Sequence, residues 1–407
     1  MQSFFGSENA FPLSAYSTLA PAPAEKSSAS TSTLCEPHKP SIPDPAPRDG
    51  LADITQQMQN MFLGPSLLPQ PQLQPQMQPL VPSPKPENLA TLFCGRPRPL
   101  PVALPPPSQA AARRALLGPP DEDIDADDAD EPIFCSAFVE EVYDGLRARE
   151  AADAVDADYL ARVQAPGSGV TARTRALLVS WMMEVCLRFR LASETLYLSV
   201  ALVDRYLARR AARRDTLQLL GVTAMFVAAK FEEVYPPPLD DFVYASADAF
   251  APADIVACER DLLAAVRWNL TPPVPLLFLR RFSKAAGGDA LLHTMGKYLL
   301  ERALLSVAAL RHAPSLQAAG AVYLARVLLG APGPAWPRTL RHHSAYTEAE
   351  VLPCAQTLVA LLTAPDPKLR FVVQKYSSPR LGAVAQTAAS RAVAASQILQ
   401  HRLLYLE

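Results

Sequence analysis

The chain has 407 residues, of which 41 are proline, and its 38 Lys and Arg residues nearly balance its 40 Asp and Glu residues. This balance excludes the basic field that sequence-independent binding to nucleic acid or to an anionic membrane requires. The six cysteines include no CxxC pair, which fits neither a disulfide framework nor a zinc cluster and predicts reduced thiols inside the cell. We also expect no signal peptide and no membrane-spanning helix, because no sufficiently long apolar run is present.

Residues 1–120 hold 24 of the 41 prolines, interspersed with Gln, Ser and Ala. Proline at this frequency stops helices from propagating, so we predict a disordered regulatory arm with polyproline II character. The acidic run DEDIDADDADE follows at 121–131, and repulsion between its carboxylates favours an extended chain. We interpret residues 121–133 as an acidic spacer before the folded part, with a specific binding role as the alternative.

From about Phe134 onward, apolar residues recur at three- and four-residue steps, which predicts amphipathic helices. Ser193 is a plausible N-cap for one of them, and Asp215 with Gln218 resembles a capping pair for another. The first predicted block, residues 134–271, contains FVEEVYDGLRARE, RTRALLVSWMMEVCLRF, SETLYLSVALVDRYL, LQLLGVTAMFVAAKF and PADIVACERDLLAAVRW.

A proline cluster at 272–275 separates this block from a second one at 272–380, and residues 381–407 are predicted as a partly helical tail. Asp289 is a predicted N-cap, and Thr347 with Glu350 fits a capping box. The second block contains LFLRRFSK, LLHTMGKYLLERALL, SLQAAGAVYLARVLLG, TEAEVLPCAQTLVALLT and PKLRFVVQKY. With no strand pattern, the predicted fold class is all-α, with two consecutive blocks of about five helices each.

Signatures of catalysis are absent from the sequence. It contains no GxxxxGK[ST] or GxGxxG loop, no HExxH helix and no GxSxG turn, and its histidines lack partners at ligand spacing. We therefore predict a binding or regulatory subunit without catalytic residues, cofactor or metal.

Four motifs occur in order within residues 174–270: TRALLVSWMMEV, ETLYLSVALVDRYL, LQLLGVTAMFVAAKFEEVYPP and ERDLLAAVRWNL. Together they resemble the cyclin box, and CSAFVEEVYDGLRARE, PLLFLRRFSKAAG and HTMGKYLLE resemble the B-type mitotic cyclins. The resemblance covers roughly residues 121–380. It implies two five-helix cyclin boxes and a subunit that binds and activates a cyclin-dependent kinase at the G2/M transition, without direct contact to nucleic acid or membrane. The alternatives are an A-type cyclin and a cyclin-fold general transcription factor, which would need a basic face and a zinc ribbon.

The resemblance implies that Lys230 and Glu259 contact the kinase. In the family these two residues meet and bond the backbone of the kinase's regulatory helix. The apolar part of the same interface would come from Phe231, Leu263, Trp268 and Leu270. Ordinary core packing is the alternative for these side chains.

The family's buried ion pair corresponds to Arg175 and Asp204 on consecutive helices. An arginine fork that faces a carboxylate across two helices fixes their relative register. The predicted role of the pair is therefore structural.

A substrate-docking patch is also implied, for substrates and inhibitors that carry an Arg-x-Leu motif. Its residues are Leu177, Leu178, Trp181, Glu184 and Gln218. Apolar side chains would receive the leucine and Glu184 the arginine, although some of the leucines must belong to the core. The sequence departs from the family at Thr174, where methionine is common, and at Ser180, where aspartate is usual, and Thr174 would shrink the apolar floor.

Arg280, His293 and Lys297 resemble the B-type phosphate pocket, with His293 and Lys297 one helical turn apart. A solvated basic face is the alternative. The strongest basic cluster, ARRAARRD, holds Arg209, Arg210, Arg213 and Arg214. We interpret it as a solvated loop, with nuclear import or nucleic-acid contact as the alternative.

Within the arm, Arg48, Leu51 and Ile54 match the Arg-x-x-Leu-x-x-Ile destruction box that such a cyclin presents to the ubiquitin ligase of mitotic exit. An overlapping export signal is predicted at Ile54, Met58, Met61 and Leu63, and Ser83 precedes a proline as a candidate phosphorylation site. The resemblance implies a protein that shuttles between cytoplasm and nucleus, with the centrosome as a further location.

Overall fold

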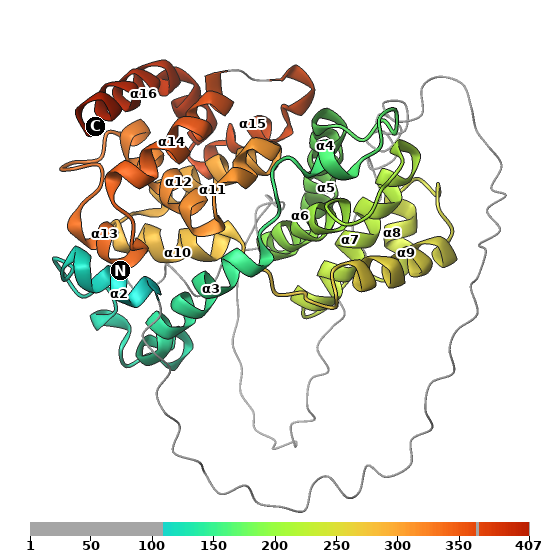
Figure 1. The fold of residues 1–407 in the computed structure, drawn as a ribbon, viewed down its shortest axis with the longest axis horizontal. Coiled ribbons are helices and arrows are strands. Elements are labelled where there is room, and N and C mark those ends of the chain that lie inside the picture. The colour runs from blue at the N-terminus through green and yellow to red at the C-terminus, as the bar shows by residue number, and fades with distance from the viewer. Residues whose placement is uncertain (1–108, 364–365, 407) are drawn as a thin grey trace, which may run out of the picture.

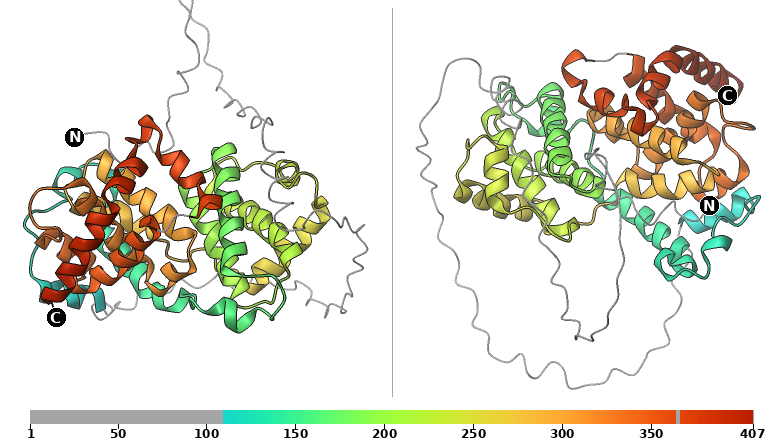
Figure 2. Two further views of the ribbon diagram at one scale, coloured as in Figure 1. Left: turned by 90° about the horizontal axis from the view of Figure 1, so that it is seen from above. Right: turned by 180° about the vertical axis from the view of Figure 1, so that it is seen from behind.

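The computed structural model describes residues 109–363 and 366–406, and helices are the only regular secondary structure in this part of the chain. This confirms the predicted all-α fold class. The helices form two bodies that lie side by side (Figure 1), and the view from behind in Figure 2 shows the same division. The proline cluster at 272–275 lies in the chain between them.

The first body consists of α4 (Tyr159–Val163), α5 (Ala172–Arg188), α6 (Ser193–Leu207), α7 (Leu217–Glu232), α8 (Leu239–Ala245) and α9 (Pro252–Ala265). Its central helix is α7, which packs against α5, α6 and α9. A helix surrounded in this way must be apolar on most sides, as LQLLGVTAMFVAAKFE is. Gly221 permits the close approach to α5, because a Cβ there would lie 2.7 Å from Leu178 Cδ1.

The second body consists of α10 (Pro275–Ala285), α11 (Ala290–Leu304), α12 (Pro314–Leu329), α13 (Arg338–Ser344), α14 (Glu348–Thr363), α15 (Phe371–Tyr376) and α16 (Val384–Leu406). The alanine-rich α12 is its central helix and contacts α10, α11, α14 and α16. Most of the predicted partly helical tail forms α16, which packs on α14 and buries Leu399 in the core.

Two predicted helix starts are wrong. Ala192, rather than Ser193, is the N-cap of α6, and Glu233 from the end of α7 accepts its backbone N–H at 2.7 Å. Asp215 pairs with Arg213 instead of capping α7. The caps at Asp289 and at Thr347 with Glu350 are confirmed, since each side chain accepts the predicted backbone N–H.

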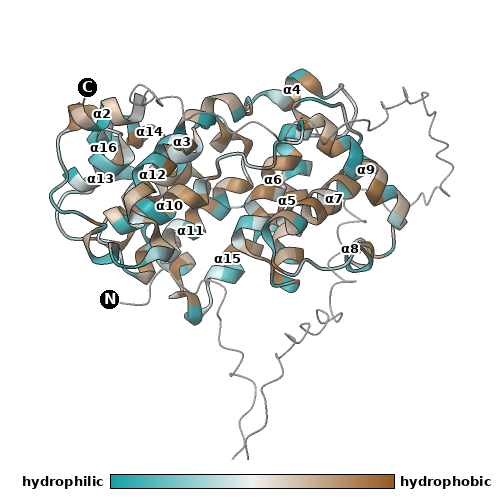
Figure 3. Cartoon of the chain, turned by 90° about the horizontal axis from the view of Figure 1, so that it is seen from below, coloured by the Kyte–Doolittle hydropathy of each residue, from teal (hydrophilic) through white to brown (hydrophobic). Residues whose placement is uncertain are grey.

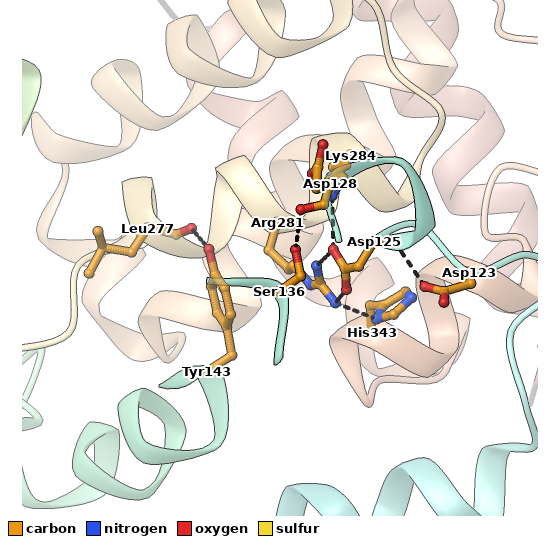
Figure 4. A network of polar contacts seen from close by, with 9 residues as sticks. All are labelled: Asp123, Asp125, Asp128, Ser136, Tyr143, Leu277, Arg281, Lys284 and His343. Atoms are coloured by element: carbon orange, nitrogen blue, oxygen red, sulfur yellow. Dashed lines mark hydrogen bonds and ion pairs between the residues drawn. The ribbon is translucent and has the colours of Figure 1, made fainter. Parts of the chain in front are cut away.

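The acidic run is docked on the second body rather than extended. Asp125 accepts two hydrogen bonds from Arg281, at 2.5 and 2.6 Å, and one from Lys284 at 2.8 Å (Figure 4). Residues 109–117 upstream form α2 (Gln109–Leu117), which contacts α13. Two predictions are thus corrected. Residues 109–117, predicted as part of the disordered arm, form a helix, and paired charges hold the run at 121–131 against α10 instead of leaving it extended.

A long helix, α3 (Val139–Asp153), runs from the second body to the junction with the first (Figure 1). Near its start, the Tyr143 hydroxyl donates to the Leu277 carbonyl of α10 at 3.0 Å. Near its end, Asp153 accepts hydrogen bonds from Arg205 of α6 and from Asn269. This helix therefore contacts both bodies directly.

Hydrophobic residues, brown in Figure 3, concentrate on the helices that form the two cores, with α5, α6 and α7 as the clearest group. No helix among the described residues is both long enough and apolar enough to cross a membrane.

Candidate interaction sites

Large apolar side chains are exposed where α7 and α9 end. Phe231, in the last turn of α7, is 48% exposed, and Trp268, just beyond α9, is 72% exposed. Val234 and Tyr235 follow α7 and are exposed as well. Because α7 and α9 pack against each other, the first body presents these side chains around one helix pair. Exposed apolar groups of this size are typical of a protein interaction surface.

Lys230 and Glu259 form an ion pair across α7 and α9, which confirms that these two predicted residues meet. The Lys230 ammonium also lies 4.0 Å from the centre of the Phe226 ring, a cation–π contact that helps to hold the lysine side chain in place. Both side chains remain partly exposed, so each keeps hydrogen-bonding capacity for a partner's backbone. Leu263, in contrast, is buried in the core, and Leu270 is only partly exposed, as the core-packing alternative expects.

Arg175 and Asp204 form the predicted buried pair, with two parallel hydrogen bonds of 2.6 Å each. Burial alone would lower the pKa of the Arg175 guanidinium, but the charge and hydrogen bonds of Asp204 outweigh it and raise that pKa above its usual value. Tyr159 adds a hydroxyl donor to Asp204 at 2.8 Å, a partner that no sequence motif indicated. The remaining arginine nitrogen donates to the Leu304 carbonyl of the second body at 2.8 Å, so the pair also joins the two bodies.

The predicted docking patch is mostly covered in this structure. We expected only some of the leucines to belong to the core, but Leu177, Leu178 and Trp181 are all buried in the core of the first body. Gln218 is buried too. Its amide nitrogen and the Trp181 indole nitrogen are buried N–H donors without a hydrogen-bond partner. Such groups are costly to leave unpaired.

Glu184 is the one residue of the predicted patch that stays partly exposed. Burial raises the pKa of its carboxyl to about 7, and the nearby Arg188 charge opposes that rise only in part.

The threonine at position 174, where the family commonly has methionine, has a structural explanation. The Thr174 hydroxyl accepts the Thr171 N–H at 2.8 Å, and the Thr174 N–H donates to the Thr171 hydroxyl, so Thr174 completes the capping box of α5.

The predicted phosphate trio comes from α10 and α11. Arg280 forms an ion pair with Glu194 of the first body, and His293 Nδ1 lies 3.1 Å from the Ser283 hydroxyl. Lys297 follows His293 by one turn of α11. A phosphate at this site would therefore compete with Glu194 for Arg280.

Among the described residues, Glu140, His342 and His343 offer ligand atoms within 4.8 Å of one another, the spacing of a conceivable metal site. Burial and the charge of Arg281 lower the pKa of His343 to about 3, which keeps the ring neutral. His342 Nδ1 lies 2.9 Å from the Gly118 carbonyl. A cation here would lie beside Arg281, so the local charge favours a polar junction between α3 and α13 over a metal centre.

The exposed basic loop fits the predicted solvated loop: Arg213 pairs with Asp215, and Arg210 lies 3.9 Å from Asp261. The predicted destruction box at Arg48, Leu51 and Ile54, the export signal and Ser83 lie outside the described residues.

Comparison with known proteins identifies both bodies. Residues 141–271 match the family described as "Cyclin, N-terminal domain", and residues 273–390 match "Cyclin, C-terminal domain". The second match extends past residue 380, in agreement with the packing of α16.

Several relatives are about 40% identical to this chain over aligned segments of about 260 residues. G2/mitotic-specific cyclin-B of Dictyostelium discoideum is 40% identical over 265 residues, which cover 65% of this chain and 60% of that protein. G2/mitotic-specific cyclin-B2 of Oryzias javanicus is 42% identical over 263 residues, which cover 64% of this chain and 67% of that protein. A viral cyclin from herpesvirus saimiri aligns with a TM-score of 0.49 at 23% identity and covers 55% of this chain and 96% of its own. The two matched domains and the two cyclin-B relatives place the chain in the cyclin family, alongside its B-type members.

Proposed function

We propose that the chain binds and activates a cyclin-dependent kinase at the G2/M transition, as a non-catalytic regulatory subunit. The observation that carries the proposal is the Lys230 and Glu259 ion pair with exposed Phe231 and Trp268 nearby, at the family's kinase-binding positions. A protein kinase needs its own Lys and Glu ion pair formed to position the ATP phosphates. A subunit that holds the kinase's regulatory helix inward supplies that condition.

The test is a reconstituted assay with purified kinase, a histone-type peptide and this chain. Charge reversal by Lys230→Glu sets two carboxylates against each other, and we expect activation to fall about 100-fold or more. Arg338→Glu is the matched control, since Arg338 is an exposed cation on α13 whose nearest acidic partner, Asp121, is 3.8 Å away. Full activation by Lys230→Glu, measured on a variant with an unchanged circular dichroism spectrum, would contradict the proposal.

We further propose that α5 and α7 recruit Arg-x-Leu substrates and inhibitors. The unpaired N–H groups of Trp181 and Gln218 support this, because peptide carbonyls are the acceptors they lack. Glu184 supplies a carboxylate for the arginine. Since both donors are buried, neighbouring side chains must move before a peptide can reach them.

A phosphate pocket at Arg280, His293 and Lys297 is a further proposal. In this pocket a partner's phosphate competes with Glu194 for Arg280. Glu194→Gln should therefore tighten the binding of a phosphopeptide, whereas a triple alanine variant of the trio should weaken it. Equal affinity for all three proteins in a fluorescence-polarisation titration would remove the pocket.

For the arm we propose capture by the ubiquitin ligase of mitotic exit, and shuttling between cytoplasm and nucleus. Arg48→Ala with Leu51→Ala should lengthen the half-life of the protein after anaphase onset. A fluorescent fusion, followed with and without an export inhibitor, tests the location. Unchanged turnover of the double variant would argue against the destruction box, and a fusion confined to one compartment would argue against shuttling.

A further inference from the structure

The exposed Trp268 is displayed by a strained turn. At the end of α9 the Trp268 N–H donates to the Leu263 carbonyl at 2.9 Å and the Arg267 N–H to the Ala264 carbonyl at 3.1 Å, the pattern of a Schellman motif. Glycine usually occupies the left-handed position of this motif. Here Arg267 occupies that position, with φ of 57°, and Trp268 after it is left-handed as well, with φ of 58°. Two successive side-chain-bearing residues in this region persist only when surrounding groups hold them.

The groups that hold this turn come from α6 and α3. Arg205 Nη1 donates to the Asn269 carbonyl at 2.7 Å, and the Asn269 side-chain amide donates to Asp153 Oδ1 at 2.8 Å. Arg205 Nη2 also reaches Asp153, at 3.3 Å. Arg205 is buried and Asp153 nearly so, and charge-assisted hydrogen bonds are strong where water is excluded. Asn269 is thus fixed through its backbone and its side chain, directly beside Trp268.

Two further contacts extend the support. The Thr271 N–H donates to Asn269 Oδ1 at 3.1 Å, and Arg149 of α3 donates to the Thr271 carbonyl at 3.3 Å. Arg149 and Asp153, one turn apart on α3, therefore hold Thr271 and Asn269 in the segment that follows Trp268.

The same helix is fixed to the second body close to this point. Glu150 accepts the Ser315 N–H at 2.5 Å and the Ser315 hydroxyl at 2.8 Å, at the N-terminus of α12. Glu150 is buried, and a carboxylate at a helix N-terminus is favourably placed. The turn that displays Trp268 thus rests on a helix end that the second body holds.

We infer that Asp153, Arg205 and Asn269 are positioning residues for the kinase interface, which hold Trp268 in its outward conformation without touching the kinase themselves. The inference rests on the proposed function, in which Trp268 contacts the kinase. It gives α3 a role in partner binding and extends the determinants of that binding beyond the surface to a buried network.

A double-mutant cycle with kinase affinity as its readout tests the inference. Asn269→Ala removes the amide but leaves Asp153 paired with Arg205, so the fold should persist. We expect Asn269→Ala and Trp268→Ala each to weaken kinase binding about tenfold, and the double variant to bind no more weakly than Trp268→Ala alone. Equal losses from Asn269→Ala in both backgrounds, or no loss at all, would overturn the positioning role. Failure of the unsubstituted chain to bind would instead overturn the proposed function, and the inference with it.

A second measurement does not depend on the kinase. Trp181 and Trp336 are buried, so iodide reaches Trp268 selectively, and the anisotropy of the quenchable fluorescence reports its mobility. Asn269→Ala should lower this anisotropy. Arg149→Ala, which loosens the same turn through Thr271, should lower both anisotropy and affinity by smaller amounts. The control is Arg311→Ala, which removes an exposed pair with Asp158 and should change neither. Unchanged anisotropy in Asn269→Ala would count against the inference even if affinity fell.

Discussion

Arg175 and Asp204 illustrate how strongly the fold can depend on a single buried ion pair. Each charge is almost entirely removed from water and paired with the other; Asp204 also accepts the Tyr159 hydroxyl, and Arg175 also donates to the Leu304 carbonyl. Replacing one partner would therefore strand the other inside the protein. The pair is better understood as a condition for folding than as a net source of stability.

We predict that Asp204→Ala lowers the free energy of unfolding by about 3 to 5 kcal/mol, the usual cost of leaving a buried charge without its partner. Urea denaturation followed by circular dichroism measures this. Arg162→Ala, which breaks an exposed pair with Asp156, should change the same quantity by less than about 1 kcal/mol. Similar losses in the two variants would contradict the buried character of the first pair.

Glu184 leads to a prediction about pH. Since burial raises its pKa to about 7, its carboxyl is largely protonated at pH 6 and largely ionised at pH 8. Only the ionised form attracts an arginine. The affinity for an Arg-x-Leu peptide should thus rise about tenfold between pH 6 and pH 8.

Glu184→Gln is the control for this pH dependence, because its affinity for the peptide should be weak and flat with pH. The stability of the fold should change in the opposite direction. A carboxyl whose pKa is raised in the folded state stabilises the fold at low pH, and this contribution is lost as the pH rises through about 7. A pH-independent affinity in the unsubstituted chain would exclude Glu184 from arginine recognition.

For single residues, the sequence predicted which side chains pair better than it predicted which side chains are exposed. The motifs located Lys230, Glu259, Arg175 and Asp204 correctly, because paired charges sit in distinctive local sequence. They did not predict that Trp181 is buried, because a helical pattern does not tell which neighbouring helices cover a face. The bond from the Ala192 N–H to Glu233 was equally hidden, since the two residues lie 41 positions apart in the sequence.

Among the elements, the segment from α2 to α3 differs most from its prediction. Eight acidic residues in a run of eleven favour an extended chain when the run is considered alone. Arg281 and Lys284 reverse that outcome, and they lie some 156 residues away from their partner Asp125. No local pattern could have paired them.

This docking leads to a third prediction. Burial by itself would raise the pKa of Asp125, but hydrogen bonds and charge from Arg281 and Lys284 lower it to about 2. The carboxylate therefore stabilises the fold above about pH 4, and this contribution disappears as the pH falls toward 2. At pH 7, Asp125→Asn should lower stability by about 1 kcal/mol, a figure reduced for solvent screening.

The measurement is the difference in melting temperature between Asp125→Asn and the unsubstituted chain, recorded from pH 7 down to pH 3. The difference should narrow below pH 4. Asp130→Asn, at an exposed carboxylate of the same acidic run, is the control and should melt with the unsubstituted chain throughout. A gap that stays constant with pH would argue against the pairing with Arg281.

Across the whole molecule, the two bodies are connected by more than a linker. Arg175 bonds the Leu304 carbonyl, α3 contacts both bodies, and α15 packs against α5. Connections of this number and burial should make the bodies unfold together.

We predict one cooperative transition, with equal urea midpoints for the emission of Trp181, in the first body, and Trp336, in the second. Variants that keep only one of these tryptophans, by Trp→Phe changes at the other positions, separate the two signals. Arg175→Ala, which removes the bond to Leu304 and strands Asp204 in the first body, should lower the midpoint of Trp181 below that of Trp336. Separate midpoints in the parent chain would instead make the bodies independent folding units.

Gly320 of α12 and Cys354 of α14 meet so closely that a Cβ at residue 320 would lie 2.8 Å from the sulfur. Neither position can enlarge by itself without displacing the other helix. In evolutionary terms the two sites should vary as a pair, so that a lineage with alanine at the first carries a smaller residue, or a shifted helix, at the second. An alignment of close orthologues would thus record the spacing of these two helices as a correlation between two columns.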